Sequence, residues 1–164
     1  MHLSIPSVGI EGKVTEYTPQ ERINNGGKII PPENMSIVWD SWFCRQQNIL
    51  SIPSAQAEDC VYIAGHSSKY EPAAFNELIN MPVGAEATLT AADGSSVTYA
   101  KFTDEVTIPK ATQQTDERLY PKEYIPGCLK LVTCQWEGAR DGNNTTLNLR
   151  VATLMVVRST GPTS

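Results

Sequence analysis

The stretch CLKLVTCQ, residues 128 to 135, combines a strand-like apolar run with a cysteine near each end. Leu, Val and Thr pack well in β-strands, and alternation along a strand puts Val132 and Cys134 on one face. We therefore expect Cys134 at the end of a strand, beside the polar segment that follows it. Such a thiol can be inert core filler, half of a disulfide, a metal ligand or a nucleophile, and the rest of the chain must supply the partner that distinguishes these roles.

Composition places the chain among single globular domains. Its 164 residues are 40% hydrophobic and 19% charged, which is enough for one domain with a core. The net charge of -5, without a run of lysine or arginine, argues against binding to nucleic acid or to an anionic membrane surface. No apolar stretch approaches the roughly 20 residues that span a bilayer, and the N-terminus lacks the pattern of a signal peptide.

Strand signals outnumber helix signals. Runs rich in β-branched and aromatic residues, with stretches of period two, occupy residues 61–66, 86–102, 129–134 and 146–157. Asp93-Gly94 divides the second run as a hairpin turn does. One helix is predicted over residues 71–81, where Pro72 suits the first turn and Pro82 ends it. The pattern predicts a mostly β fold, a barrel or sandwich of short strands with one or two short helices.

Two segments are predicted to be long surface loops. Residues 15–36 and 109–127 are rich in Pro, Asn, Gly, Gln and charged residues, and loops of that length are often functional. The final residues, STGPTS at 159–164, are expected to be disordered. We therefore predict one folded domain over residues 1–158.

His66 has a more informative position than His2, which lies near the chain end. It closes the apolar run CVYIAGH and precedes SSKY, so a rigid strand would hold it at the edge of solvent. A histidine that only caps a strand is the plain alternative, as an inert buried thiol is for Cys134. An imidazole beside a thiol, however, activates it and can protonate a leaving amine. The two residues are therefore a candidate nucleophile and acid-base pair.

Arg150 interrupts the apolar run LNLRVATLMVV. A guanidinium in such a strand is costly to bury unless it faces a cleft or a partner. We expect it to face the same cleft as Cys134, where it can donate hydrogen bonds to a substrate carbonyl or an oxyanion. Arg140 is nearer in sequence but lies in EGARDGNN, a turn-forming segment that would leave a donor mobile.

The other cysteines are assigned to structure. Six positions along a strand separate Cys128 from Cys134 by roughly 20 Å, which prevents a disulfide between them. Any disulfide would join Cys44 to Cys60, or either of these to Cys128. The cysteines lack a zinc-binding spacing, and the acidic residues at 104–117 lack the spaced ligands of a calcium site. No metal or other cofactor is predicted.

Taken in order, the segments IAGHSS, LKLVTC and NLRVATLMVV resemble the sortases, cysteine transpeptidases that attach proteins to the cell walls of Gram-positive bacteria. The family's marks are a Gly-His at a strand end, a Thr-Leu-x-Thr-Cys strand and an arginine on the next strand. Here they are Gly65-His66, Leu131 to Cys134, and Arg150, with Lys130 in place of the first threonine. The resemblance covers residues 3–158 and leaves the class open, a class E/F-like or phage-encoded enzyme being among the candidates.

The resemblance implies a closed β-barrel of about eight strands and a reaction. Cys134 would attack the Thr carbonyl of a Leu-Pro-x-Thr-Gly-like sorting motif, and an amine, or slowly water, would resolve the thioester. His66 would protonate the departing amine and deprotonate the incoming one, while Arg150 holds the motif and the oxyanion. The 16 positions from Cys134 to Arg150 imply an extended loop at 135–146.

The same resemblance makes the segment 109–127 one wall of the substrate groove, with a merely solvated loop as the alternative. It also predicts four substrate-binding residues: Thr133, Ser67, Tyr120 and Tyr124. The partners would be proteins that bear the motif and an amine from a cell-wall peptide or a pilin lysine, without nucleic acid, and the enzyme is expected to be a monomer. The full-length protein would act at the cell surface or be held in the membrane by an anchor that this chain lacks, unless it is a soluble phage-encoded form. A noncatalytic barrel and a peptidase that only hydrolyses remain the alternatives.

Overall fold

The computed structural model describes residues 1–40, 60–123, 125–136, 140–143 and 145–161. These residues contain one short α-helix, α1 (Pro19–Asn24), and the 3-10 helices η1 (Pro6–Val8), η3 (Leu78–Asn80) and η4 (Lys110–Thr115). Their strands are β1 (His2–Ile5), β2 (Ile10–Tyr17), β3 (Ile37–Asp40), β4 (Val61–Gly65), β5 (Glu86–Thr90), β6 (Ser96–Lys101), β7 (Val106–Pro109), β8 (Cys128–Cys134) and β9 (Asn148–Thr160).

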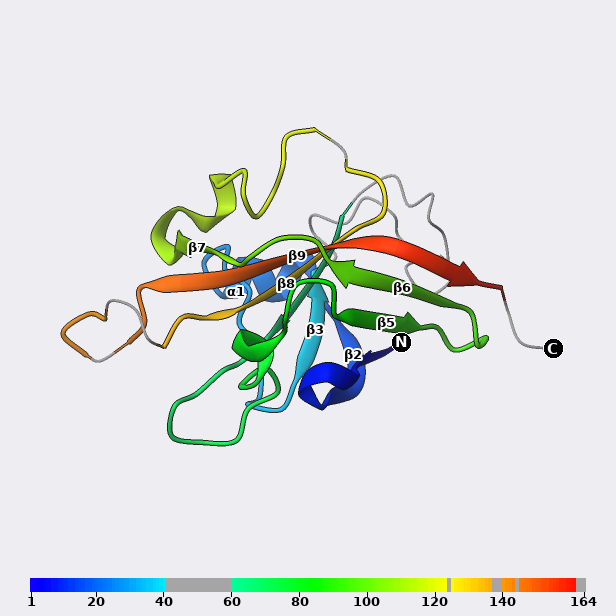
Figure 1. Ribbon diagram of the computed structural model, residues 1–164. Helices are drawn as coiled ribbons and strands as arrows, with labels where there is room; N and C mark the ends of the chain where they lie inside the picture. Colours follow the sequence, from blue (N-terminus) through cyan, green and yellow to red (C-terminus); the bar gives the residue numbers. More distant parts are fainter. Residues whose placement is uncertain (41–59, 124, 137–139, 144, 162–164) are drawn as a thin grey trace.

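Eight of these strands close into a barrel (Figure 1). Their order is β6-β5-β1-β2-β3-β4-β8-β9, and β9 pairs back to β6. β7 lies outside this ring, where it pairs with residues 148–151 of β9, while residues 154–160 of the same strand pair with β6. The length of β9 allows both pairings. The mostly β, closed barrel of about eight strands is therefore confirmed.

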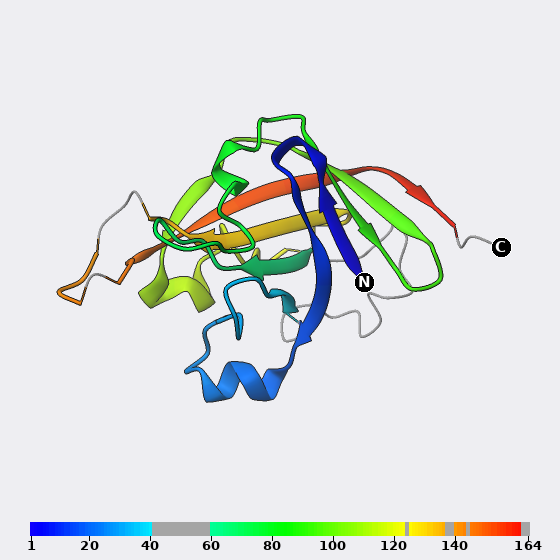
Figure 2. The same cartoon turned by 90° about the horizontal axis from the view of Figure 1, so that it is seen from below.

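Side chains along β4 and β8 point alternately to the two faces of the sheet and so contribute to two hydrophobic clusters. Ile63 and Leu131 belong to a cluster with members from all eight strands of the ring, which places that cluster inside the barrel. Tyr62, Ala64 and Val132 belong to a second cluster on the outer face of β4 and β8. Figure 2 shows α1 and η4 on the same side of these two strands. The outer face of β4 and β8 is thus covered by a second layer.

The helix predicted over residues 71–81 is wrong, since Leu78–Asn80 alone form a 3-10 turn there. Tertiary packing decides this segment. Phe75 is fully buried and its N–H donates to the carbonyl of His66 at 2.9 Å. A Cβ atom at Gly65 would lie 2.8 Å from the Phe75 ring. Glycine before the histidine is therefore required by the close approach of this ring.

An α-helix forms instead within the segment 15–36, for which the sequence predicts a loop. The Thr18 side chain accepts from the N–H of Glu21 at 3.2 Å, and the Glu21 carboxylate accepts from the N–H of Thr18 at 2.6 Å. With Pro19 in the first turn, this is a capping box. The letters TPQE thus carry a helix-start signal, and β2 reaches Tyr17 just before it.

The predicted hairpin is confirmed, whereas the predicted disordered tail is wrong for its first two residues. β5 and β6 pair as a hairpin around Asp93-Gly94, with Gly94 at a φ of 85°. The hydroxyl of Ser95 hydrogen-bonds the Asp93 carboxylate and lowers its pKa. β9, by contrast, continues through Thr160, so the first two residues of the predicted disordered tail are paired with β6.

The described cysteines bear on the predicted disulfide. Cys60 and Cys128 are both buried in the second cluster, and no disulfide joins them to each other. A pairing that involves Cys44 lies outside the described residues. The position of Cys128 agrees with the structural role predicted for it.

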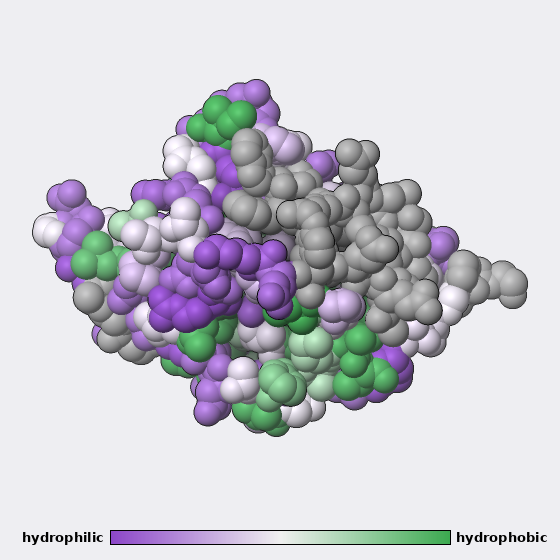
Figure 3. All heavy atoms as spheres, turned by 90° about the horizontal axis from the view of Figure 1, so that it is seen from above, coloured by the Kyte–Doolittle hydropathy of each residue, from purple (hydrophilic) through white to green (hydrophobic). Residues whose placement is uncertain are grey.

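The surface above η4 and the segment that leads to β8 is mixed in character. Hydrophilic side chains occupy the centre of this view, and smaller hydrophobic patches lie toward its margin (Figure 3). This agrees with the polar composition of residues 109–127. Among the described residues, no helix has both the length and the apolar character needed to cross a membrane.

Candidate active site

His66 and Cys134 lie at matching positions at the ends of two neighbouring parallel strands, since β4 ends at Gly65 and β8 ends at Cys134. β4 and β8 pair in parallel with Ala64 opposite Val132, an offset of 68 positions. His66 and Cys134 are separated by the same 68 positions. The imidazole and the thiol therefore lie at the same end of the two strands, at their carboxyl ends. Adjacent strands in a sheet are about 4.8 Å apart.

A cavity of about 250 Å³, termed the outer cavity, is lined by both residues. Its floor is apolar and includes Ala64, Val132 and Leu149. Residues 28–31 form one wall, and Lys110 and Gln113 of η4 contribute another part of the lining. The outer cavity thus lies between the segment that follows α1 and the segment that follows β7.

The wall at residues 28–31 is fixed by hydrogen bonds to its backbone. The hydroxyl of Tyr17 donates to the carbonyl of Lys28 at 2.9 Å and accepts from the N–H of Ile30 at 3.2 Å. At its end, the carbonyl oxygen of Pro31 lies 2.6 Å from Nε2 of His66. A carbonyl only accepts, so Nε2 carries the hydrogen and Nδ1 is the basic nitrogen of the neutral ring.

A second cavity of about 170 Å³, termed the inner cavity, is also lined by Cys134 and Thr133. Arg150 lines it and lies opposite Thr133 in the β8–β9 pairing, whereas Cys134 lies opposite Leu149. Because side chains alternate between faces, Arg150 and Cys134 leave opposite faces of the sheet. Arg150 and Cys134 nevertheless line the inner cavity together, as expected, whereas His66 lines the outer cavity, and Cys134 lines both.

Two of the predicted substrate contacts line these cavities. Ser67 lines the inner cavity, and its hydroxyl donates to the carbonyl of Cys134 at 2.9 Å. Thr133 lines both cavities. Its hydroxyl is buried and has no hydrogen-bond partner among the described residues. A buried hydroxyl without a hydrogen-bond partner destabilises the fold. A ligand that forms a hydrogen bond with it removes that penalty and so binds more tightly.

Tyr120 lies elsewhere, buried in the second cluster. Its hydroxyl accepts from the Arg22 guanidinium at 2.7 Å and donates to the Asp40 carboxylate at 3.0 Å, and Arg22 also pairs with Asp40. Burial, reinforced by the negative charge of Asp40, raises the pKa of the Tyr120 phenol. This position does not agree with the predicted substrate contact and indicates a structural role. Tyr124 lies outside the described residues.

The sequence does not predict several residues of the site. Lys69 and Trp136 line the inner cavity, and the indole N–H of Trp136 donates to the carbonyl of Ser67. Residues 28–31 line the outer cavity although they come from a predicted loop. The signal in the sequence is the apolar run IIPP within an otherwise polar segment.

In the described part of the chain, no group of three or more His, Cys, Asp or Glu side chains is placed to hold a metal ion.

Solved structures with this fold include several enzymes of one family. Sortase A from Listeria monocytogenes superposes with a TM-score of 0.63 and 16% identity, over 99% of this chain and 90% of that chain. Sortase C1 from Streptococcus agalactiae has a TM-score of 0.62 and 17% identity, over 96% of this chain and 66% of that chain. Sortase A from Corynebacterium diphtheriae has a TM-score of 0.61 and 14% identity, over 96% and 60%. At these identities the likeness is one of fold.

The sequence comparison defines the family. No curated protein gives a significant match. The family model of the Sortase domain, however, matches residues 3–153, which is most of the chain and includes His66, Cys134 and Arg150. The chain therefore belongs to the sortase family of cysteine transpeptidases.

Proposed function

We propose that the protein cleaves a Leu-Pro-x-Thr-Gly-like sorting motif through a thioester on Cys134 and transfers the acyl group to an amine. The observation that carries this proposal is that two cavities meet at one thiol, one beside His66 and one beside Arg150. Acyl transfer in two steps requires the donor carbonyl to reach the Cys134 sulfur and the acceptor amine then to reach the carbonyl carbon of the thioester. Two approaches to Cys134 provide for both.

The outer cavity suits the donor motif. Its floor of Ala64, Val132 and Leu149 is apolar, as the Leu and Pro side chains of the motif require. The wall at residues 28–31 and η4 enclose the cavity from two directions. An extended peptide in this cavity would place its Thr carbonyl near Cys134.

In the first step the thiolate of Cys134 attacks the Thr carbonyl. A carbon–sulfur bond forms, the carbon–nitrogen bond to Gly breaks, and Nδ1 of His66 gives the departing amine the proton that it took from the Cys134 thiol. Arg150 donates to the oxyanion of the tetrahedral intermediate. In the second step an amine attacks the thioester and loses a proton to His66, and the thiolate leaves. The products are a new amide and the original enzyme.

The partners that we propose are those that membership of the sortase family implies. The donor would be a protein that carries the motif near its C-terminus, and the acceptor an amine of a cell-wall peptide or a pilin lysine. The full-length protein would act at the cell surface. The inner cavity gives an amine acceptor room to approach Cys134.

A peptide reaction tests the proposal. Purified protein is incubated with a library of motif peptides, with and without an amine, and the products are identified by mass spectrometry. Ligation that requires the amine supports a transpeptidase. Cleavage without ligation would instead identify a peptidase, and no reaction above that of the Cys134→Ala variant would identify a noncatalytic barrel.

A further inference from the structure

Cys60 and Cys128 lie at matching positions at the beginnings of β4 and β8, and we term them the dithiol. The parallel pairing of the two strands starts with Val61 opposite Leu129. Cys60 directly precedes Val61, and Cys128 directly precedes Leu129. The α-carbons of matching residues on neighbouring strands are about 4.8 Å apart. A disulfide spans that distance without distortion of the backbone.

The two thiols lie on the same face of the sheet. Side chains alternate along a strand, and Tyr62, two residues after Cys60, belongs to the second cluster on the outer face. Cys60 and Cys128 belong to that cluster as well, and 1% of each residue is exposed. Sγ of Cys60 lies 3.9 Å from the carbonyl oxygen of Ile125, three residues before Cys128. The Cys60 thiol therefore points toward the segment that carries Cys128.

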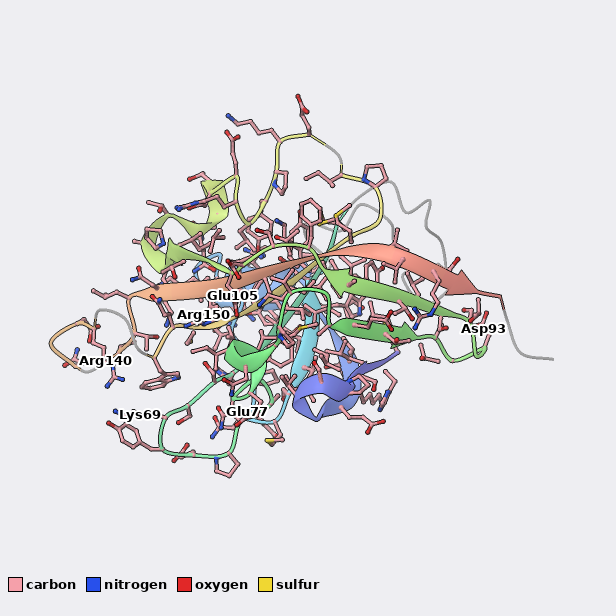
Figure 4. All side chains as sticks on the ribbon, in the orientation of Figure 1. Lys69, Glu77, Asp93, Glu105, Arg140 and Arg150 are labelled. Carbon is pink, nitrogen blue, oxygen red and sulfur yellow. The ribbon has the colours of Figure 1, made fainter. Side chains whose placement is uncertain are left out.

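The dithiol is remote from the thiol of Cys134. In the β8–β9 pairing, Cys134 lies opposite Leu149, whereas Cys128 lies opposite Met155. Figure 4 shows Arg150, the residue after Leu149, toward the end of the barrel at which β9 begins. The positions from Cys128 to Cys134 span roughly 20 Å of strand, which is too far for a disulfide. Oxidation of the dithiol therefore leaves Cys134 available for its own reaction.

We propose that the dithiol is oxidised to a disulfide that joins the beginning of β4 to the beginning of β8. The proposal rests on the cell-surface location given with the proposed function, because disulfides form and persist in oxidising surroundings. No disulfide joins the two cysteines in the structure. The structure therefore represents the reduced form of the pair.

The oxidant is a second disulfide, supplied by a small molecule or by a thiol–disulfide oxidoreductase. One thiolate of the dithiol attacks this disulfide, and a mixed disulfide forms as the first sulfur of the oxidant leaves. The other thiolate then attacks the mixed disulfide and displaces the second sulfur. The protein loses two hydrogen atoms, and the oxidant is reduced to two thiols. Because both cysteines are buried, the exchange takes place as the chain folds or when the sheet opens locally.

The disulfide stabilises the strand pairing on which the candidate site depends. β4 and β8 place His66 and Cys134 at their far ends, and one register relates the two ends of the strands. The bond closes a loop of 68 positions between Cys60 and Cys128. Such a crosslink lowers the entropy of the unfolded chain and so raises the melting temperature.

Peptide mapping tests the pairing in the wild-type protein. The protein is refolded in a mixture of reduced and oxidised glutathione, alkylated and cut with trypsin. A lysine or arginine lies between each cysteine and the next, so trypsin puts the four cysteines on four peptides. Mass spectrometry should find the Cys60 peptide joined to the Cys128 peptide. Alkylation of both peptides, or a bond from either of them to Cys44 or Cys134, would overturn the proposal.

Melting temperatures with and without dithiothreitol give a second test. The reductant should lower the melting temperature of the refolded wild type by about 5 °C or more. Cys60→Ala and Cys128→Ala should each melt at one temperature in both conditions, whereas Cys44→Ala, the matched control, should keep the shift. Each variant is compared with itself, so the direct effect of the substitution cancels. A shift that persists in Cys60→Ala would contradict the proposal.

Ligation of the motif peptide, measured on the same samples, separates this proposal from the proposed function. Normal ligation without the disulfide would overturn the disulfide alone. A disulfide in a protein that does not ligate would support the pairing and count against the proposed function.

Discussion

Nε2 of His66 donates to the carbonyl oxygen of Pro31 at 2.6 Å, a contact between residues 35 positions apart. The candidate acid-base residue is thereby tied to the same segment, residues 28–31, that walls the outer cavity. The orientation of the imidazole and the shape of the proposed donor site are thus coupled. Residues that hold this wall are expected to influence catalysis without touching the thiol.

Tyr17 is the first of these residues. Tyr17→Phe keeps the buried ring but removes the hydroxyl that bonds Lys28 and Ile30. We expect kcat/KM for the motif peptide to fall about fivefold or more, and the free energy of unfolding to drop by about 1–3 kcal/mol. Steady-state kinetics and urea denaturation measure the two effects.

Tyr70→Phe is the matched control, because 70% of the Tyr70 surface is exposed. It should leave the unfolding midpoint unchanged. Wild-type kinetics in Tyr17→Phe, together with a lowered stability, would show that Tyr17 supports the fold alone.

The buried pair of Arg22 and Asp40 supports a second prediction. Both side chains are almost inaccessible, and Asp40→Ala leaves the guanidinium buried without its carboxylate. We expect a loss of about 3–5 kcal/mol in the free energy of unfolding, measured by denaturant titration. Glu86→Ala breaks the exposed pair with Arg158 and should have little effect. Equal stability of the two variants would contradict the role assigned to the buried pair.

The buried phenol of Tyr120 is expected to make the free energy of unfolding depend on pH. Burial and the charge of Asp40 raise the pKa of its phenol above the ordinary value of 10.0. Above that pH the unfolded chain loses the phenolic proton while the folded chain keeps it. Stability from this group is therefore complete below pH 10 and declines above it, by about 1.4 kcal/mol per pH unit. Denaturant titrations from pH 8 to 11 should show a steeper decline for wild type than for Tyr120→Phe, and parallel curves would argue against the shift.

Arg150 and Arg140 are distinguished by kinetics. Arg150 lines the inner cavity with Cys134, whereas Arg140 packs on the ring of Trp136. Arg150→Ala should lower kcat/KM for the motif peptide by about 10² or more, as for the loss of one oxyanion donor. Arg140→Ala should change it less than about threefold, and Arg150→Lys should recover little. The reverse ranking, with both variants folded by circular dichroism, would reassign the arginine.

The His66–Cys134 pair could be predicted from the sequence because both residues end apolar runs, and a strand end is a local property. The parallel register of β4 and β8 then sets them side by side. The face from which Arg150 projects could not be predicted, since a shift of one residue in the β8–β9 register reverses it.

The other differences also come from tertiary contacts. Residues 71–81 follow a helical pattern, yet the packing of Phe75 against Gly65 overrides it. Tyr120 lies in a polar segment, and its burial depends on Arg22 and Asp40, residues that are distant in sequence. The capping box at Thr18 and Glu21 was local and could have been predicted.

The identity of the nucleophile is tested most directly by the intact mass of the protein after incubation with a motif peptide that ends in a vinyl sulfone. The wild type and Cys128→Ala should each gain the mass of one peptide, because Cys128 is buried away from the two cavities. His66→Ala should react more slowly, and Cys134→Ala should not react. Labelling of Cys134→Ala at the wild-type rate, or loss of labelling in Cys128→Ala, would contradict the assignment of Cys134 as the nucleophile.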